Sequence, residues 1–388
     1  MQVSVQVLGQ ISLCLLPVTI EKADSPPLSQ TIGMETQVLA ALAVSDFKQA
    51  SRLLKQWKVR EPNSPLLRLY VAQLQERTNQ LEAAEKNYLA LLKKMPGHKL
   101  VKQARAGIAR VQAQQQAQKA QALADAKQAN GGDAVSLLAI APPNPEQKEE
   151  AIANLAKVFN LDAYTARMKL PVQGIRLHRV GPYGELSYFA KALDKTPTLI
   201  TKVKDIQSLQ TFQVCYFESV MPKPVVVCKN SEGQLGKISF DWREVSGQVS
   251  AQLPIFEQVV DIGNWGKTVH KEKVQDYAQV IDFHLPKRKI VVRLCDRLYQ
   301  YTEGTKLASA FEVNSRIKWN NLLEQLSNVI DKANKVPHYN EFTRFGKGAL
   351  EFIKILPIIE PNLDIDRRAP SHWDPVFHLY SGIYFFNR

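Results

Sequence analysis

The sequence predicts a multidomain protein of the mixed α+β class, and three observations support this fold class. The chain has 388 residues, which is more than one ordinary domain contains. Apolar and small residues recur at helical spacing through residues 34–115, whereas most later segments alternate apolar and polar side chains as β-strands do. Apolar residues make up 45% of the chain and charged residues 22%, so sizeable cores are expected and disorder throughout the chain is excluded.

Changes in composition and clusters of glycine and proline divide the chain into six expected segments. They are an N-terminal extension of uncertain structure (1–33), helical repeats (34–118), a linker (119–145), a small α+β domain (146–230), a β-rich barrel-like domain with a capping helix (231–333), and a C-terminal helix with an irregular tail (334–388). For the extension, two further interpretations stay open: a cleaved signal peptide, and translation that starts at Met34. No run approaches the roughly 18 apolar residues of a membrane-spanning helix, so none is predicted.

The helical segment repeats against itself at an offset of 34 residues, a period that indicates stacked helical hairpins. The matched pairs are Ala50 with Ala84, Leu54 with Tyr88, Trp57 with Leu91, Pro62 with Pro96, and Ala72 with Ala106. Small residues at these positions would let two helices approach closely, and the prolines would end the second helix of each hairpin. The segment resembles the tetratricopeptide repeat family, although Met34 and Arg68 stand where that family usually has a tryptophan.

The resemblance to tetratricopeptide repeats implies a concave, peptide-binding groove lined by the first helix of each hairpin. The positions that match its exposed surface are Gln73, Glu76, Arg77, Gln103 and Arg110. Arginine side chains there would hold an acidic side chain or a C-terminal carboxylate through paired hydrogen bonds. The chain as a whole also resembles uncharacterised multidomain cyanobacterial proteins, a resemblance that implies no activity.

The middle segment, residues 146–230, mixes helical and strand patterns and predicts a small α+β sandwich of ferredoxin-like type. A helix over EQKEEAIANLAKVFNL is followed by a shorter one that begins at Asp162, whose carboxylate would accept hydrogen bonds from the first free N–H groups. Strands are expected at IRLHRV, TLITKVKDI, FQVCYFES and PVVVCK, and a turn and helix at GPYGELSYFAKALDKT.

Residues 231–333 predict strands that close on a helix. The strand-like runs are GKISFDWREV, GQVSAQLP, FEQVVDI, YAQVIDFHLP, KIVVRLC and RLYQYT, with a hairpin turn at PKRK, residues 286–289. An amphipathic helix follows, with Trp319, Leu322, Leu323, Leu326 and Ile330 on one face. This arrangement resembles a pleckstrin-homology-like β-barrel, which implies a closed sheet. The last segment predicts a helix at NEFTRFGKGALEFIKIL and a final apolar strand at VFHLYSGIYFF.

The net charge of +13 is concentrated in two segments. Residues 51–110 hold 13 basic and 4 acidic residues, and residues 157–204 hold 9 and 3. Such surfaces favour acidic proteins, nucleic acid or anionic membranes, but they also occur on ordinary solvated helix faces. The candidate anion or nucleic-acid contacts are Arg176, Arg179 and Lys191 beside a strand–helix turn, and Lys287, Arg288 and Lys289 at the PKRK turn.

Motifs for catalysis, metal binding or cofactor binding are absent from the sequence. It contains no HExxH, GxxxxGK[ST], GxGxxG or GxSxG, and its four cysteines lack zinc-finger spacing. His372, Asp374 and His378 lie close in sequence, but His378 stands in an apolar strand-like run beside Phe377, so we expect it to be packed and hydrogen-bonded rather than a metal ligand. We therefore assign no catalytic residue, metal or cofactor, and infer no small-molecule substrate.

The sequence thus predicts a non-enzymatic adaptor or assembly factor that binds an acidic protein or peptide through the basic surface of its helical repeats. Because so few cysteines are typical of a reducing compartment, we expect a cytoplasmic location. Two alternatives stay open: an RNA-binding or ribosome-associated protein, and a protein that binds the membrane surface peripherally.

Overall fold

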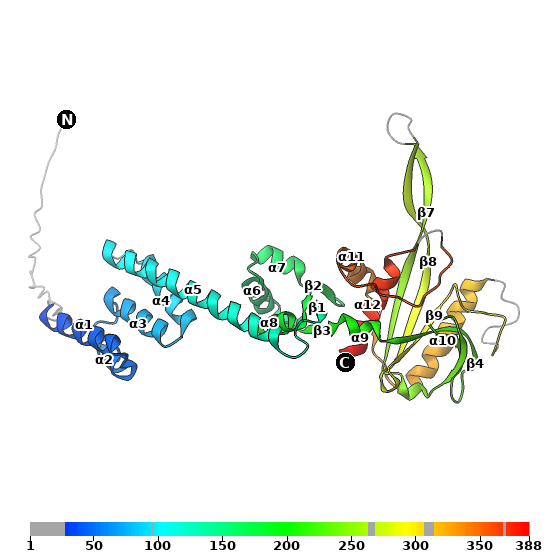
Figure 1. Ribbon diagram of the computed structural model, residues 1–388, viewed down its shortest axis with the longest axis horizontal. Helices are drawn as coiled ribbons and strands as arrows, with labels where there is room; N and C mark the ends of the chain where they lie inside the picture. Colours follow the sequence, from blue (N-terminus) through cyan, green and yellow to red (C-terminus); the bar gives the residue numbers. More distant parts are fainter. Residues whose placement is uncertain (1–27, 95–96, 263–267, 306–313, 368–369, 388) are drawn as a thin grey trace, which may run out of the picture. The chain divides into compact units, whose positions relative to one another are not determined.

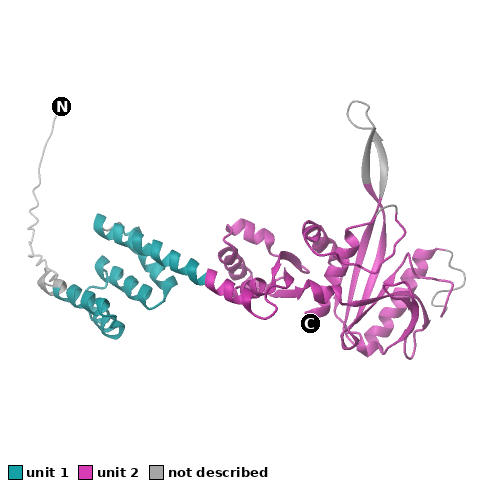
Figure 2. Cartoon of the chain, in the orientation of Figure 1, with its two compact units in different colours: residues 1–119 teal, residues 120–388 magenta. Residues whose placement is uncertain are grey.

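The computed structural model describes residues 28–94, 97–262, 268–305, 314–367 and 370–387. The chain forms two compact units, unit 1 (residues 1–119) and unit 2 (residues 120–388), which Figure 2 shows in different colours. The predicted extension lies outside the described residues as far as residue 27.

From residue 28 onward, the described part of unit 1 consists of helices, as the sequence predicts. They are α1 (Leu28–Ala43), α2 (Phe47–Arg60), α3 (Pro65–Arg77), α4 (Leu81–Lys93) and the first part of α5 (His98–Gln128), labelled in Figure 1. Pro65 occupies the first turn of α3, where the missing N–H costs no helical hydrogen bond. The predicted break at Pro62 falls between α2 and α3, and the one at Pro96 lies outside the described residues.

The backbone of unit 1 repeats with the offset of 34 residues. Ser45 lies in the turn between α1 and α2, and Asn79 lies in the turn between α3 and α4. Both adopt the left-handed conformation, with φ of 59° and 60°. The residue after each donates its N–H to the carbonyl five residues before it, at 2.9 and 2.8 Å. The two hairpins therefore turn in the same way.

Side-chain packing in unit 1 follows the predicted repeat at most positions. Ala50, Ala72 and Ala84 are fully buried. Ala106, however, is exposed, so the prediction that it packs is wrong. The next residue, Gly107, takes that role, because a Cβ there would lie only 2.4 Å from the ring of the buried Tyr88.

Unit 2 begins with a three-stranded antiparallel sheet in the order β2-β1-β3. Its strands are β1 (Val135–Ile140), β2 (Arg176–Pro182) and β3 (Thr198–Lys202), and its helices are α6 (Lys148–Phe159), α7 (Ala163–Lys169), α8 (Tyr183–Ala192) and α9 (Val203–Gln207). The carboxylate of Asp162 caps α7 as predicted, because it accepts the Thr165 N–H at 2.9 Å. The predicted linker is not a linker: α5 extends into it, and β1 is the central strand of this sheet.

The second sheet has seven strands in the order β10-β7-β8-β9-β4-β5-β6. They are β4 (Gln210–Ser219), β5 (Val225–Lys229), β6 (Leu235–Ser239), β7 (Gly247–Ile262), β8 (Thr268–Leu285), β9 (Ile290–Cys295) and β10 (His338–Tyr339). The sheet is open, with β10 and β6 at its edges, so the predicted pleckstrin-homology-like barrel is wrong. β4 and β5, which were expected in the smaller domain, belong to this sheet, and the β4–β9 pair is parallel.

The long β7–β8 hairpin replaces two of the predicted strands, GQVSAQLP and FEQVVDI, which are both part of β7 (Figure 1). The run RLYQYT forms turns rather than a strand. Between β8 and β9, the predicted turn at PKRK is confirmed, with Lys289 in the left-handed conformation.

Three helices complete unit 2: α10 (Ser315–Ala333), α11 (Phe342–Ile353) and α12 (Trp373–Phe386). Helix α10 is the predicted amphipathic helix, and Trp319, Leu322, Leu326 and Ile330 are its buried residues. The expected final strand is instead α12, whose residues from Val376 to Phe385 are all buried. A helix that is buried on every side lacks a polar face, so its sequence pattern cannot be distinguished from that of a buried strand.

Candidate functional site

A groove in unit 1 lies against α2, α3 and the start of α4, and we call it the α2–α4 groove. It encloses about 560 Å³. Apolar side chains that include Leu54, Leu67 and Val71 form part of its wall. Three cationic side chains, Lys55, Lys58 and Arg68, line it as well, and none of its described lining residues is acidic. The groove therefore combines apolar surface with uncompensated positive charge.

The local sequence explains why these cations face the groove. Asp46 caps α2 by accepting the Gln49 N–H at 2.9 Å. Ala50, Leu54 and Trp57 form the buried face of α2, whereas Lys55 and Lys58 are exposed. Since residues three apart on a helix are neighbours, the two lysines lie beside each other.

Arg68 enters the groove from α3 and is only half-buried. The side chains of Lys55, Lys58 and Arg68 have no hydrogen bond or ion pair to any other described residue. These three charges are therefore available to a ligand, and binding it would break no internal contact that they make.

The arginines that the sequence predicted for a groove are engaged inside unit 1. Arg77 donates from Nη1 to the carbonyl of Leu42 at 2.6 Å. Arg110 forms a bidentate pair with Glu76, from Nε to Oε1 at 2.7 Å and from Nη2 to Oε2 at 3.0 Å. The Tyr88 hydroxyl also donates to Glu76, at 2.7 Å.

This cluster ties three helices together. Burial raises the pKa of the Glu76 carboxyl, but the hydrogen bonds from Arg110 and Tyr88 outweigh that effect and leave its pKa below the usual value. Gln73 is half-buried and Gln103 is exposed, and neither lines the α2–α4 groove. The sequence search missed Lys55 and Lys58, although their spacing on the polar face of α2 was visible.

In unit 2, the structure separates the three predicted contacts around the strand–helix turn. The Arg179 guanidinium lies 5.2 and 4.8 Å from the ring centroids of Phe159 and Phe189, and its Nη1 lies 3.3 Å from Glu185 Oε1. These contacts hold α6 and α8 to the sheet. Lys191 is exposed on α8, whereas Arg176 lines a cavity that it shares with α11.

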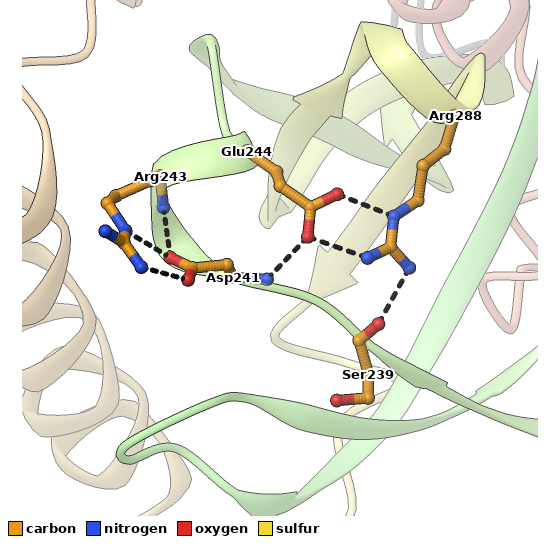
Figure 3. Close-up of polar contacts among 5 residues, drawn as sticks. All are labelled: Ser239, Asp241, Arg243, Glu244 and Arg288. Atoms are coloured by element: carbon orange, nitrogen blue, oxygen red, sulfur yellow. Dashed lines mark hydrogen bonds and ion pairs between the residues drawn. The ribbon is translucent and has the colours of Figure 1, made fainter.

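At the β8–β9 turn, Arg288 serves as a clamp (Figure 3). Its Nε and Nη2 donate to the two carboxylate oxygens of Glu244, both at 2.7 Å, and Nη1 donates to the carbonyl of Ser239 at 2.7 Å. The hydrogen bonds from Arg288 lower the pKa of the Glu244 carboxyl. Of the three candidate anion or nucleic-acid contacts at this turn, only the exposed Lys287 and Lys289 have no partner among the described residues.

A serine, a histidine and an aspartate also meet in the core of unit 2. Ser381 donates to Asp282 Oδ2 at 2.6 Å, and its Oγ lies 2.8 Å from His284 Nε2. Since the serine proton is given to the aspartate, His284 acts as donor to the serine rather than as its base. All of these residues are fully buried, so no substrate reaches the hydroxyl and the cluster is structural.

Arg293 completes this buried network. Its Nε and Nη2 bind the two oxygens of Asp282 at 2.7 Å, and Nη1 donates to the carbonyl of Pro361. His378 is buried as the sequence predicts: its Nδ1 lies 3.4 Å from Arg293 Nη2 and its Nε2 lies 3.3 Å from the carbonyl of Ile206. Only the neutral tautomer with its proton on Nε2 satisfies both contacts.

Within the described residues, no three His, Cys, Asp or Glu side chains form a group that could hold a metal ion. In the same part of the chain, every helix is too short or too polar to cross a bilayer. Comparison with known protein families, with curated protein sequences and with solved structures finds no match to this chain.

Proposed function

We propose that the protein is a non-enzymatic adaptor that binds an acidic peptide segment of a partner protein in the α2–α4 groove. The observation that carries the proposal is the set of three groove cations without an acidic partner, Lys55, Lys58 and Arg68. The described lining of the groove contains no acidic residue, so its free cations attract carboxylates. The apolar wall gives the aliphatic side chains of the ligand a surface against which they can be buried.

The repeat architecture supports this assignment. The offset of 34 residues and the matching left-handed turns at Ser45 and Asn79 support placing unit 1 among the tetratricopeptide-like repeats, which the sequence resembles. Arg68 stands where that family usually has a tryptophan, so an aromatic packing position is replaced here by a groove cation. A cytoplasmic location is part of the same proposal and is supported by the free, buried thiols of Cys215, Cys228 and Cys295.

Binding would proceed in two stages. The positive field of the groove draws in a segment rich in Asp and Glu, and this stage weakens as salt screens the charges. Apolar contacts then hold the segment at about 25 cal/mol for each Å² of apolar surface buried. Affinity for a purely acidic peptide should therefore fall with salt more steeply than affinity for one with aliphatic anchors.

The test measures fluorescence anisotropy of a labelled peptide of alternating Asp and Leu with the full chain. The variant Lys55→Glu plus Lys58→Glu should weaken binding by about tenfold or more, because two attractions become repulsions. The matched control is Lys99→Glu plus Lys102→Glu, which reverses two exposed lysines of α5 with the same spacing, outside the groove. The control should bind like the unchanged chain, and equal losses in both variants would reduce the effect to overall charge.

The same assay separates this function from RNA binding. A single-stranded RNA that displaces the peptide, and whose affinity falls equally in the groove variant and the control, would favour the nucleic-acid alternative.

A further inference from the structure

A second basic cavity lies in unit 2, and we call it the α7–α11 pocket. It encloses about 580 Å³ between the end of α7, the loop at residues 170–175, the start of β2 and one face of α11. Four cationic side chains line it: Lys169, Arg176, Arg344 and Lys347. Glu351 is the one acidic side chain among its described lining residues. The excess positive charge of the pocket therefore comes from two segments that are far apart in the sequence, one on each side of the pocket.

The loop that forms one wall is held closely against α11. Gly174 adopts a φ of +64°, and a Cβ there would lie 2.7 Å from the Cβ of Glu341, next to the start of α11. The close approach places Gln173 beside α11, where its Oε1 accepts a long hydrogen bond of 3.5 Å from Arg344 Nη1. A glycine is required here both for the left-handed backbone and for the space.

The cations are only partly used by the protein itself. Arg176 donates from Nη1 to the carbonyl of Met168 at 2.5 Å, which positions the guanidinium and leaves its other N–H groups free for a ligand. Lys169 and Lys347 have no partner among the described residues. No cation of the pocket is neutralised by a carboxylate within hydrogen-bond distance in this part of the structure.

Apart from the four cations and Glu351, the described lining is uncharged. Burial, and then the nearby charges of Lys169, Arg179 and Arg176, lower the pKa of His178 to about 4, so its imidazole is neutral at pH 7. Leu170, Val172 and Phe352 add apolar surface. The volume falls within the range of small-molecule sites, about 300–1,000 Å³.

We propose that the α7–α11 pocket binds a phosphate-bearing small molecule, with its phosphate groups on the four cations and its less polar body against the apolar wall. Two arginines offer forked donor pairs that match phosphate oxygens, and two lysines add unpartnered point charge. The excess of three positive charges suits a ligand with more than one negative charge. The inference concerns unit 2 alone and does not depend on the peptide-binding groove of unit 1.

The test is calorimetric titration of the full chain with inorganic pyrophosphate. The variant Lys169→Gln plus Lys347→Gln should weaken binding by about tenfold or more. The matched control, Lys195→Gln plus Lys204→Gln, removes two exposed lysines of the same unit that do not line the pocket. The control should leave affinity unchanged, and a second pocket variant, Arg176→Gln plus Arg344→Gln, should reproduce the loss.

Three outcomes would overturn the proposal. The first is that the unchanged chain does not bind pyrophosphate, and the second is that the pocket variant and the control lose equal affinity. The third is that pyrophosphate does not bind whereas single-stranded RNA binds tightly and requires the pocket lysines. Vesicles that contain a phosphoinositide distinguish the source of the phosphate. Binding to vesicles without binding to soluble pyrophosphate would place the ligand in a membrane and contradict a small molecule. If the α2–α4 groove of unit 1 does not bind peptide, pyrophosphate binding to unit 2 should still be observed, so the two proposals fail independently.

Discussion

The core of unit 2 and the α2–α4 groove of unit 1 use positive charge in opposite ways. In the core, the fully buried Arg293 is held by both oxygens of Asp282 and by a backbone carbonyl, so its charge serves only the fold. In the groove, Lys55 and Lys58 are exposed and have no described partner. The net charge of +13 therefore does not measure how many cationic side chains are available to a ligand. That number depends on which of them already have partners within the protein.

The largest expected effect comes from breaking the core pair. Asp282→Asn should destabilise the protein by about 3–5 kcal/mol, because it leaves the Arg293 charge buried without a counter-charge. Urea denaturation measures the loss.

The matched control is Glu244→Gln, which breaks another bidentate pair where Glu244 and Arg288 are 25% and 39% exposed. Its cost should stay below about 1 kcal/mol, because water screens the pair and solvates the released arginine. Equal costs for the two variants would contradict the contrast between core and surface.

The next effect concerns the pH dependence that the same core creates. Burial, and then the charge of Arg293, lowers the pKa of His378 from its usual 6.5 to about 4. The unfolded chain therefore takes up a proton near pH 6.5 that the folded chain refuses until about pH 4, so this residue destabilises the fold as pH falls through that window. At 1.36 kcal/mol per pKa unit, the contribution is about 3 kcal/mol when complete.

The variant His378→Asn isolates this contribution, because asparagine keeps a hydrogen-bonding side chain that does not titrate. The stability difference between the unchanged chain and the variant should shift against the unchanged chain between pH 6.5 and 4. The comparison is needed because burial raises the pKa of Asp374 to about 6, which acts in the opposite direction over the same range. A constant difference across this range would show that His378 does not titrate as described.

A smaller effect is expected at the intermediate case, Glu76 in unit 1. Its side chain is 14% exposed and accepts hydrogen bonds from both Arg110 and Tyr88. Glu76→Gln should cost about 1–2 kcal/mol, between the core and surface pairs, since part of the released charge on Arg110 reaches water. Thermal unfolding measures the loss of stability. A loss as large as that of Asp282→Asn would show that burial does not determine the cost of breaking these ion pairs.

Local patterns in the sequence predicted the parts of the fold that depend on local physics. The helices of unit 1, the cap at Asp162 and the apolar face of α10 follow from spacing and capping within one element. The open sheet could not be predicted in this way, because the parallel pairing of β4 with β9 joins segments about 80 residues apart. Strand β1 was missed because its apolar run stands between NGGD and APPNP, which are typical of a linker.

The candidate site shows the same limit. Arg77 and Arg110 were predicted to line a groove, but their partners Leu42 and Glu76 come from other helices. No local pattern shows such contacts, whereas the spacing of Lys55 and Lys58 is local. Arg176 was predicted as a candidate anion or nucleic-acid contact, which remains a prediction. The structure places it at the wall of a cavity, and the cations of α11 that line the same cavity belong to a distant segment.

The most direct measurement of the central claim is a charge swap at the groove. The variant Lys55→Glu plus Lys58→Glu is titrated with two labelled peptides, one of alternating Asp and Leu and one of alternating Lys and Leu. If the groove is the binding site, the variant loses the acidic peptide and gains the basic one, while Lys99→Glu plus Lys102→Glu retains the original preference. A variant that loses the acidic peptide without gaining the basic one, or a control that swaps equally, would contradict the groove as the site of peptide binding.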